Sequence, residues 1–215
     1  MNQLSERVKR LSPSATLAMS QKSNELKAEG FDVINLSVGE PDFNTPDHIK
    51  EAAKKAVDEN FSRYSPVPGY PALRNAIVEK LKNENGLEYN VTQISCANGA
   101  KQSVCNLMMV LLDKGDEVII PAPFWVSYVE MVKIADGVPH IIETTEENNF
   151  KFSPKQLEDA INDKTKALIL NSPSNPTGMV YTKEELEAIA EICVKHDIYV
   201  ISDEINELVN TALTE

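Results

Sequence analysis

The chain has 215 residues, of which 42% are hydrophobic and 25% charged, a composition typical of a soluble globular protein with a substantial core. Its formal net charge of −12 argues against non-specific binding to nucleic acid or anionic lipid. No apolar run approaches the length of a membrane span, and the N-terminus lacks the apolar stretch of a signal peptide. Three scattered cysteines fit no paired motif, so we expect buried, reduced thiols in a cytoplasmic protein.

In chain order, an arm and a helix come first, starting at Ser12-Pro13 and stopping at Gly30. Strand-like runs then alternate with amphipathic helices. The runs are residues 32–37, 93–98, 117–121, 139–143, 166–170 and 198–202. Short apolar strands separated by such helices predict an α/β fold with three layers, α/β/α, around a mainly parallel sheet.

The helices between these strands carry clear start and periodicity signals. Three of them show complete i, i+3, i+4, i+7 apolar spacing, beginning at Ile49, Val104 and Leu186. Two further signals are expected capping boxes, in which Ser153 precedes Gln156 and Thr182 precedes Glu185. These patterns predict well-defined helices on both sides of the sheet.

Ligands of such sheets bind beyond the carboxyl ends of the strands. The loops expected at those ends are residues 37–43, 96–103, 121–128, 171–178 and 202–206. In the second loop, Gly99, Ala100 and Lys101 open a helix, whose free N–H groups suit an anion such as phosphate. The alternative is an ordinary helix cap with a glycine turn.

Three side chains in the other loops each allow a functional and a structural interpretation. Trp125, the only tryptophan, suits stacking on a planar ring, or else simply belongs to the core. Asp203 follows a strand expected to be buried on both faces, where a carboxylate needs a partner; a helix cap or an internal ion pair also explains it. Asn175, held by the following proline, binds a ligand or bonds within its own turn.

Several motifs are absent from the sequence. There is no G-x-G-x-x-G, no P-loop and no G-x-S-x-G. The absence of a glycine-rich fingerprint argues against a nucleotide-binding α/β domain. His48, His140 and His196 match no metal-ligand spacing, so we interpret all three as structural and expect no metal site.

Six segments in order carry a resemblance: LSVGEPDFNTP, YSPVPGYPALR, NGAKQSV, PAPFWVSY, NSPSNPTG and VISDEI. Together they resemble the class I aminotransferases of fold type I, which depend on pyridoxal phosphate, and most of all the prokaryotic-type aspartate aminotransferases. The likeness runs to Ile205. It implies residues 1–45 as an N-terminal arm and helix, part of a small domain, and residues 46–215 as a cofactor-binding large domain, incomplete at the C-terminus.

The resemblance also implies roles for particular residues. Its phosphate-binding residues are Gly99, Ala100 and Lys101. Around the cofactor ring it implies stacking by Trp125, an amide from Asn175 on the phenolic oxygen, and the Asp203 carboxylate on the ring nitrogen.

It further implies contacts that involve substrate or a second subunit. Gly39, Trp125 and Asn175 correspond to positions that touch the amino-acid substrate. Tyr64 corresponds to a tyrosine that reaches the phosphate of the neighbouring subunit in a homodimer. The implied activity is transfer of an amino group between an L-amino acid, with aspartate expected, and a 2-oxo acid.

The sequence departs from the family pattern after Ile205. The printed chain has no lysine after Lys195, whereas the family carries its cofactor-linking lysine further downstream; Asn206 stands where the pattern has tyrosine. We therefore assign no catalytic residue and expect weak or absent turnover for this truncated chain. The alternative is a non-catalytic fragment that binds the cofactor or dimerises.

Overall fold

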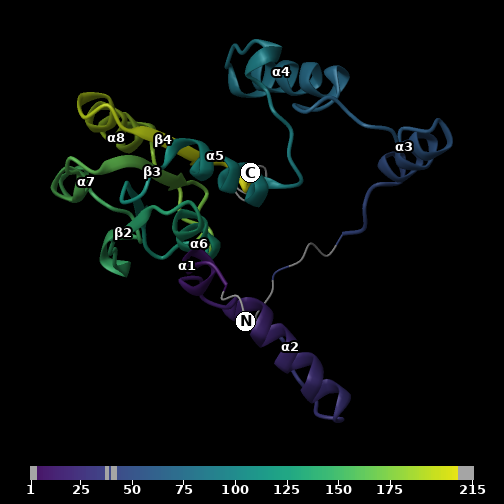
Figure 1. Ribbon diagram of the computed structural model, residues 1–215, viewed down its shortest axis with the longest axis horizontal. Helices are drawn as coiled ribbons and strands as arrows, with labels where there is room; N and C mark the ends of the chain where they lie inside the picture. Colours follow the sequence, from purple (N-terminus) through teal and green to yellow (C-terminus); the bar gives the residue numbers. More distant parts are fainter. Residues whose placement is uncertain (1–3, 37–38, 40–42, 208–215) are drawn as a thin grey trace. The chain divides into compact units, whose positions relative to one another are not determined.

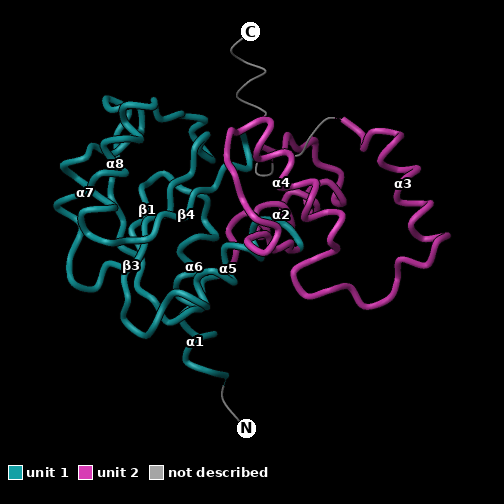
Figure 2. Tube along the Cα trace, turned by 90° about the horizontal axis from the view of Figure 1, so that it is seen from above, with its two compact units in different colours: residues 1–12, 98–215 teal, residues 13–97 magenta. Residues whose placement is uncertain are grey.

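The computed structural model describes residues 4–36, 39 and 43–207. The chain forms two compact units, residues 1–12 with 98–215 as unit 1 and residues 13–97 as unit 2 (Figure 2). The expected boundary at residue 45, between a small-domain arm and a large cofactor-binding domain, stays a prediction.

Unit 1 contains the sheet and most of the helices (Figure 1). Its elements are α1 (Glu6–Lys9), α5 (Ala100–Leu111), β1 (Glu117–Pro121), α6 (Ser127–Ile134), β2 (Val138–Ile142), η2 (Glu146–Asn148), α7 (Pro154–Ala160), β3 (Thr165–Asn171), α8 (Lys183–Lys195) and β4 (Tyr199–Asp203). The four strands are all parallel, in the order β2-β1-β3-β4. This confirms the expected α/β class with a parallel sheet.

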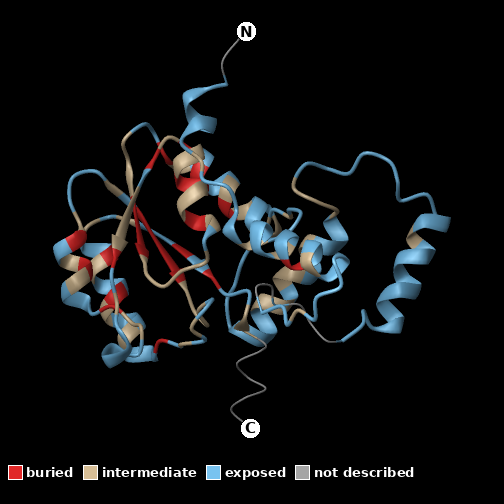
Figure 3. Ribbon diagram, turned by 90° about the horizontal axis from the view of Figure 1, so that it is seen from below, coloured by how far each residue is buried: buried red, intermediate tan, exposed pale blue. Residues whose placement is uncertain are grey.

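Helices cover both faces of the sheet. Because successive residues of a strand point to opposite faces, Val118 and Ile120 of β1 join one buried cluster and Ile119 joins the other. The first cluster includes residues of α5 and α6, and the second includes residues of α7 and α8. Figure 3 shows these buried positions concentrated on the strands and on the helix sides that face them. The three-layer prediction is therefore confirmed for this unit.

The sequence signals for two helices are confirmed in detail. Ser153 and Gln156 form a reciprocal capping box at the start of α7, and Thr182 and Glu185 form another at the start of α8. Each box satisfies two N–H groups that the helix itself leaves unpaired. The N-terminal ends of α7 and α8 are therefore held in place by these capping hydrogen bonds.

Unit 2 contains α2 (Ala15–Ala28), α3 (Asp47–Asp58), α4 (Pro71–Asn85) and η1 (Val91–Gln93). Over its described residues Ser23 alone is buried. The strands expected at 32–37 and 93–98 are wrong for the described positions, since 32–36 and 94–98 pair with no strand there. Apolar, β-branched residues favour extended backbone, but a strand forms only where a second strand satisfies its hydrogen bonds.

The cysteines follow the expectation in part. All three are free, but only Cys193 is buried, and Cys96 and Cys105 are half-buried. Across the described ranges, no helix combines the length and apolar character that crossing a membrane requires.

Candidate functional site

Three strands of the sheet end side by side at one edge, where the sequence places its polar loops. The register pairs the last residue of β3, Asn171, with the last residue of β4, Asp203. β1 ends at Pro121, just before the segment that carries Trp125. The loops after β1, β3 and β4 therefore start from a common rim, as expected of a parallel sheet.

The start of α5 offers unpaired backbone donors. Gly99 is the N-cap, with φ 85° and ψ 162°, a conformation open essentially to glycine alone. No side chain caps this helix start. The backbone N–H groups of Gly99, Ala100 and Lys101 donate to no atom of the described residues, so they remain available to an anion.

Asp203 is a buried carboxylate that forms no ion pair with a cationic side chain of the described residues. It is 8% exposed, and its Oδ2 accepts a 2.6 Å hydrogen bond from the hydroxyl of Tyr128. Its Oδ1 accepts a longer bond, 3.3 Å, from the N–H of Ile205. Within the described part of the chain, no Lys, Arg or His forms an ion pair with it. An ionised carboxylate accepts about four hydrogen bonds, so Asp203 keeps capacity for a further donor.

Trp125 connects the start of α5 to Tyr128. The ammonium of Lys101 lies 4.9 Å from the centroid of the Trp125 ring, a cation–π distance. The Trp125 and Tyr128 rings meet edge to face, with centroids 5.4 Å apart and an interplanar angle of 89°. Trp125 is half-buried against the core cluster of α5 and α6. Contacts therefore run from Lys101 to Trp125 and from Trp125 to Tyr128. The hydroxyl of Tyr128 continues this chain of contacts to Asp203.

The loop at 171–178 is held from inside. The side-chain oxygen of Asn171 accepts a 2.7 Å bond from the backbone N–H of Asn175, and its amide donates to the backbone oxygen of Asp203 at 2.8 Å. Ser174 and Gly178 close the turn with a 2.8 Å backbone bond. The Asn175 side chain is exposed, and its amide bonds to no described residue. The loop thus presents a free amide from a fixed backbone.

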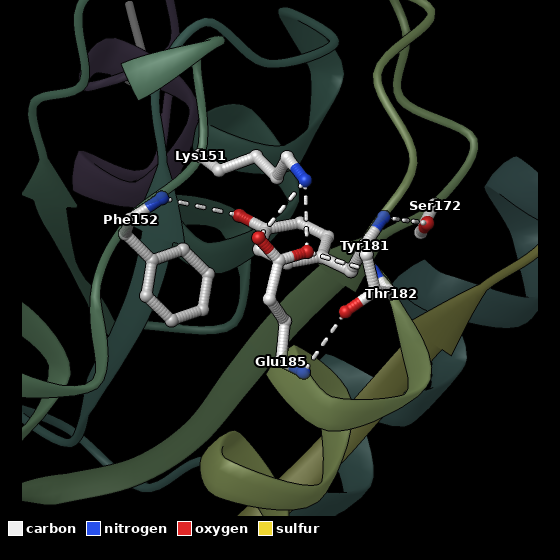
Figure 4. A network of polar contacts seen from close by, with 6 residues as sticks. All are labelled: Lys151, Phe152, Ser172, Tyr181, Thr182 and Glu185. Atoms are coloured by element: carbon white, nitrogen blue, oxygen red, sulfur yellow. Dashed lines mark hydrogen bonds and ion pairs between the residues drawn. The ribbon is translucent and has the colours of Figure 1, made fainter.

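A polar network anchors the far end of the same loop (Figure 4). The N–H of Tyr181 donates to the hydroxyl of Ser172 at 3.3 Å, and the Tyr181 hydroxyl accepts from the N–H of Phe152. Lys151 lies within 3.0 Å of both carboxylate oxygens of Glu185 and holds the pKa of that carboxyl below its usual value. Burial raises the pKa of Tyr181 to about 12.

Two residues that organise the site were not singled out by the sequence. Tyr128 is the last residue of the loop at 121–128, three residues after Trp125. Asn171 is the first residue of the loop at 171–178. Both lie in segments that the sequence marks as polar rim, but nothing local distinguishes them. Their partners are 75 and 32 residues away along the chain.

The other predicted positions lie elsewhere. Gly39 and Tyr64 belong to unit 2, where both are exposed, and their roles stay predictions. Asn206 donates a 3.2 Å hydrogen bond from its amide to the carbonyl oxygen of Pro173. It therefore ties the end of β4 to the loop after β3.

A small cavity also lies among these loops. Its lining includes Phe124, Tyr128 and Tyr181, and its volume is about 20 Å³, enough for little more than one water. The candidate site is therefore the open rim and not this cavity. In the part of the chain that the structure describes, no three His, Cys, Asp or Glu side chains gather as metal ligands would.

Free helix-start donors, an exposed amide and a buried carboxylate at the rim of a parallel sheet give this α/β protein a candidate ligand site at the strand ends. The chain belongs to the aminotransferase class I and II family, whose sequence profile matches residues 31–207.

Named relatives agree with this assignment. Over 204 residues the chain is 54% identical to an aspartate aminotransferase of Geobacillus stearothermophilus and 53% identical to one of Bacillus subtilis, matching 95% of this chain and 52% of each relative. The solved aspartate aminotransferase of Thermus thermophilus with maleate superposes with a TM-score of 0.92 at 48% identity, covering 95% of this chain and 54% of that one. The chain spans about half the length of the relatives it matches.

Proposed function

We propose that this chain is the cofactor-binding part of an aminotransferase that uses pyridoxal phosphate to move an amino group from an L-amino acid to a 2-oxo acid. The observation that carries the proposal is Asp203, a buried carboxylate at the sheet rim that lacks a cationic partner among the described residues. Burying such a charge is costly unless a partner supplies a compensating interaction. A ligand ring with a protonated nitrogen supplies one.

Other residues at the rim also suit the phosphate and the ring of pyridoxal phosphate. Pyridoxal phosphate, when bound, supplies an aromatic ring that withdraws electrons from the substrate's reacting carbon. The N–H groups of Gly99, Ala100 and Lys101 would bind the phosphate, aided by the positive end of the α5 dipole. Because Gly99 has open space where a Cβ would stand, the backbone is accessible to a ligand there.

The remaining residues orient the ring. Trp125 presents a half-buried aromatic ring for stacking. The ammonium of Lys101 lies over the same Trp125 ring, so Lys101 and Trp125 are adjacent. The Asn175 amide, on a turn fixed by the bond between its backbone N–H and Asn171, would donate to the ring's phenolic oxygen. Asp203 would hold a proton on the ring nitrogen by accepting its N–H, which would keep the ring an effective electron acceptor.

Substrate and assembly belong to the same proposal. Several relatives are called aspartate aminotransferases and others aspartate/prephenate aminotransferases, so we propose L-aspartate as the amino donor. Gly39, Trp125 and Asn175 are proposed to contact it. We also propose a cytoplasmic homodimer in which Tyr64 reaches the phosphate bound by the neighbouring subunit. The expectation of weak turnover for these 215 residues stays a prediction.

The test uses Trp125, the only tryptophan, as a fluorescence reporter. Titration with pyridoxal phosphate should quench it saturably in the wild-type chain. Asp203→Ala should weaken binding about tenfold or more, because a hydrogen bond to a charged group contributes about 1.5–3 kcal/mol. Asp163→Ala, which removes an exposed aspartate in the turn before β3, is the control and should leave affinity unchanged. Equal affinity of wild type and Asp203→Ala would contradict the proposal.

A further inference from the structure

Tyr128 is a fully packed side chain whose hydroxyl has one polar partner among the residues that the structure describes. It is 2% exposed, in the first turn of α6, and its hydroxyl donates to Asp203 Oδ2 at 2.6 Å. This distance is typical of a strong, charge-assisted O–H···O⁻ bond. The contact joins α6 to the end of β4, two segments separated by 75 positions.

The surroundings restrict the movement of this hydroxyl. Trp125 lies edge to face against the Tyr128 ring. Tyr128 belongs to the buried cluster between the sheet, α5 and α6, and Trp125 packs against that cluster. Burial, and then the hydrogen bond to Asp203, raise the pKa of the Tyr128 phenol well above its usual value. The hydroxyl therefore keeps its proton to a higher pH than an ordinary tyrosine does, and it remains a donor at neutral pH.

The two carboxylate oxygens of Asp203 consequently differ. Oδ2 is engaged by the short bond from Tyr128, whereas the described chain offers Oδ1 only the N–H of Ile205, at 3.3 Å. A carboxylate pinned at one oxygen has lost rotation about its terminal bond. A donor arriving from the rim therefore meets an acceptor whose direction is already set, which lowers the entropic cost of binding.

We propose that Tyr128 is a positioning residue, whose hydroxyl holds the Asp203 carboxylate in the orientation that accepts an N–H from the aromatic ring of a bound ligand. This rests on the proposed function, since it presumes a ring nitrogen at Asp203. The competing explanation is that Asp203 merely satisfies a buried tyrosine hydroxyl. The two explanations differ in whether removing the hydroxyl changes recognition of the ring nitrogen itself.

The experiment compares two ligands that differ only at that atom. Affinities of pyridoxal phosphate and of deazapyridoxal phosphate, in which carbon replaces the ring nitrogen, are measured for the wild-type chain and for Tyr128→Phe. The ratio of the two affinities reports the interaction at Asp203 and cancels general losses of binding. Tyr181→Phe is the matched control, because it removes a buried hydroxyl that pairs with the Phe152 N–H instead.

We expect the wild-type chain to prefer pyridoxal phosphate by about tenfold or more, the worth of a hydrogen bond to a charged group. Tyr128→Phe should lower this ratio at least severalfold, and Tyr181→Phe should leave it unchanged. A high ratio that Tyr128→Phe preserves would overturn the inference while leaving the proposed function standing. A wild-type ratio near one would overturn the proposed function, and the inference with it.

A second measurement needs no substitution and so covers a variant that fails to fold. The buried hydroxyl proton of Tyr128 should give a slowly exchanging, downfield proton NMR signal in the wild-type chain. Pyridoxal phosphate should shift this signal, and the deaza analogue should not. Equal shifts with both ligands would overturn the inference.

Discussion

The side-chain oxygen of Asn171 accepts a 2.7 Å hydrogen bond from the backbone N–H of Asn175, and this bond fixes the turn that presents the Asn175 amide. The same side chain donates to the backbone oxygen of Asp203 at 2.8 Å. One asparagine at the end of β3 therefore sets the position of two residues proposed to bind the cofactor, each from a different loop.

Replacing Asn171 with alanine should weaken cofactor binding and also lower stability. Two hydrogen bonds are lost, so the free energy of unfolding should fall by about 1–3 kcal/mol. Pyridoxal phosphate affinity should fall as well, because the Asn175 turn loses its internal support. Urea denaturation and the Trp125 fluorescence titration measure the two effects on the same preparation.

Asn162→Ala is the matched control for that variant. Asn162 also makes two side-chain bonds, to Glu117 at 2.8 Å and from the N–H of Lys164 at 2.9 Å, but at the amino ends of the strands. It should lower stability to a similar degree and leave cofactor affinity unchanged. If both variants bind the cofactor equally well, the Asn171 bonds play no part in the site.

Gly99→Ala tests the phosphate-binding start of α5. No atom lies within 4 Å of the position that a Cβ would take, so the penalty comes from backbone conformation, about 1–3 kcal/mol. Gly115 has a similar φ, 95°, and equally open space, in the turn before β1. Both alanine variants should lower the melting temperature, but Gly99→Ala alone should reduce affinity for pyridoxal phosphate. A Gly99→Ala protein with wild-type affinity would exclude this helix start as the phosphate site.

Much of the fold of unit 1 was predictable because its signals are local. The apolar runs of β1 and β3 and the capping residues Ser153 and Thr182 identify their elements from neighbouring residues alone. The runs at 32–37 and 93–98 look similar, yet over their described positions they form no strand. A strand depends on a partner elsewhere in the chain, and a single run of sequence does not specify one.

Some residues of the candidate site were likewise predictable from local sequence, and others were not. Asp203 and Asn175 were predictable as rim residues, because parallel strands bring their carboxyl ends to one edge of the sheet. Tyr128 and Asn171 were not, since each acquires its role from a hydrogen bond that spans many residues of sequence. The family resemblance assigns roles at the rim, but the bonds that hold these residues in place are visible only in three dimensions.

The core on the α5 side of the sheet is expected to dominate the stability of unit 1. Met108, fully buried in α5, loses contacts on every side when it is cut back, so Met108→Ala should cost about 2–5 kcal/mol. Val110 lies two residues further along the same helix and is 81% exposed, so Val110→Ala should change stability by about 0.5 kcal/mol or less. Similar urea midpoints for the two variants would show that α5 does not pack on the sheet in solution.

Tyr181 predicts a loss of stability in alkali. Its folded pKa, about 12, lies above the ordinary value of 10, so the neutral phenol favours the folded state. That contribution is complete below pH 10 and disappears as the pH rises from 10 to 12, by about 3 kcal/mol at most. The unfolding free energy of wild type should therefore fall relative to that of Tyr181→Phe across this window. Profiles that stay parallel throughout would contradict the burial of an un-ionised Tyr181.

The most direct test of the account is a crystal structure of the chain with pyridoxal phosphate bound. We predict the ring nitrogen within about 2.7–2.9 Å of an Asp203 carboxylate oxygen, the distance of a charge-assisted bond, with the phosphate on the N–H groups of Gly99 to Lys101. A ring bound away from Asp203, or a phosphate held instead by Arg7, Arg10 and Lys114 on the surface near α1, would contradict it.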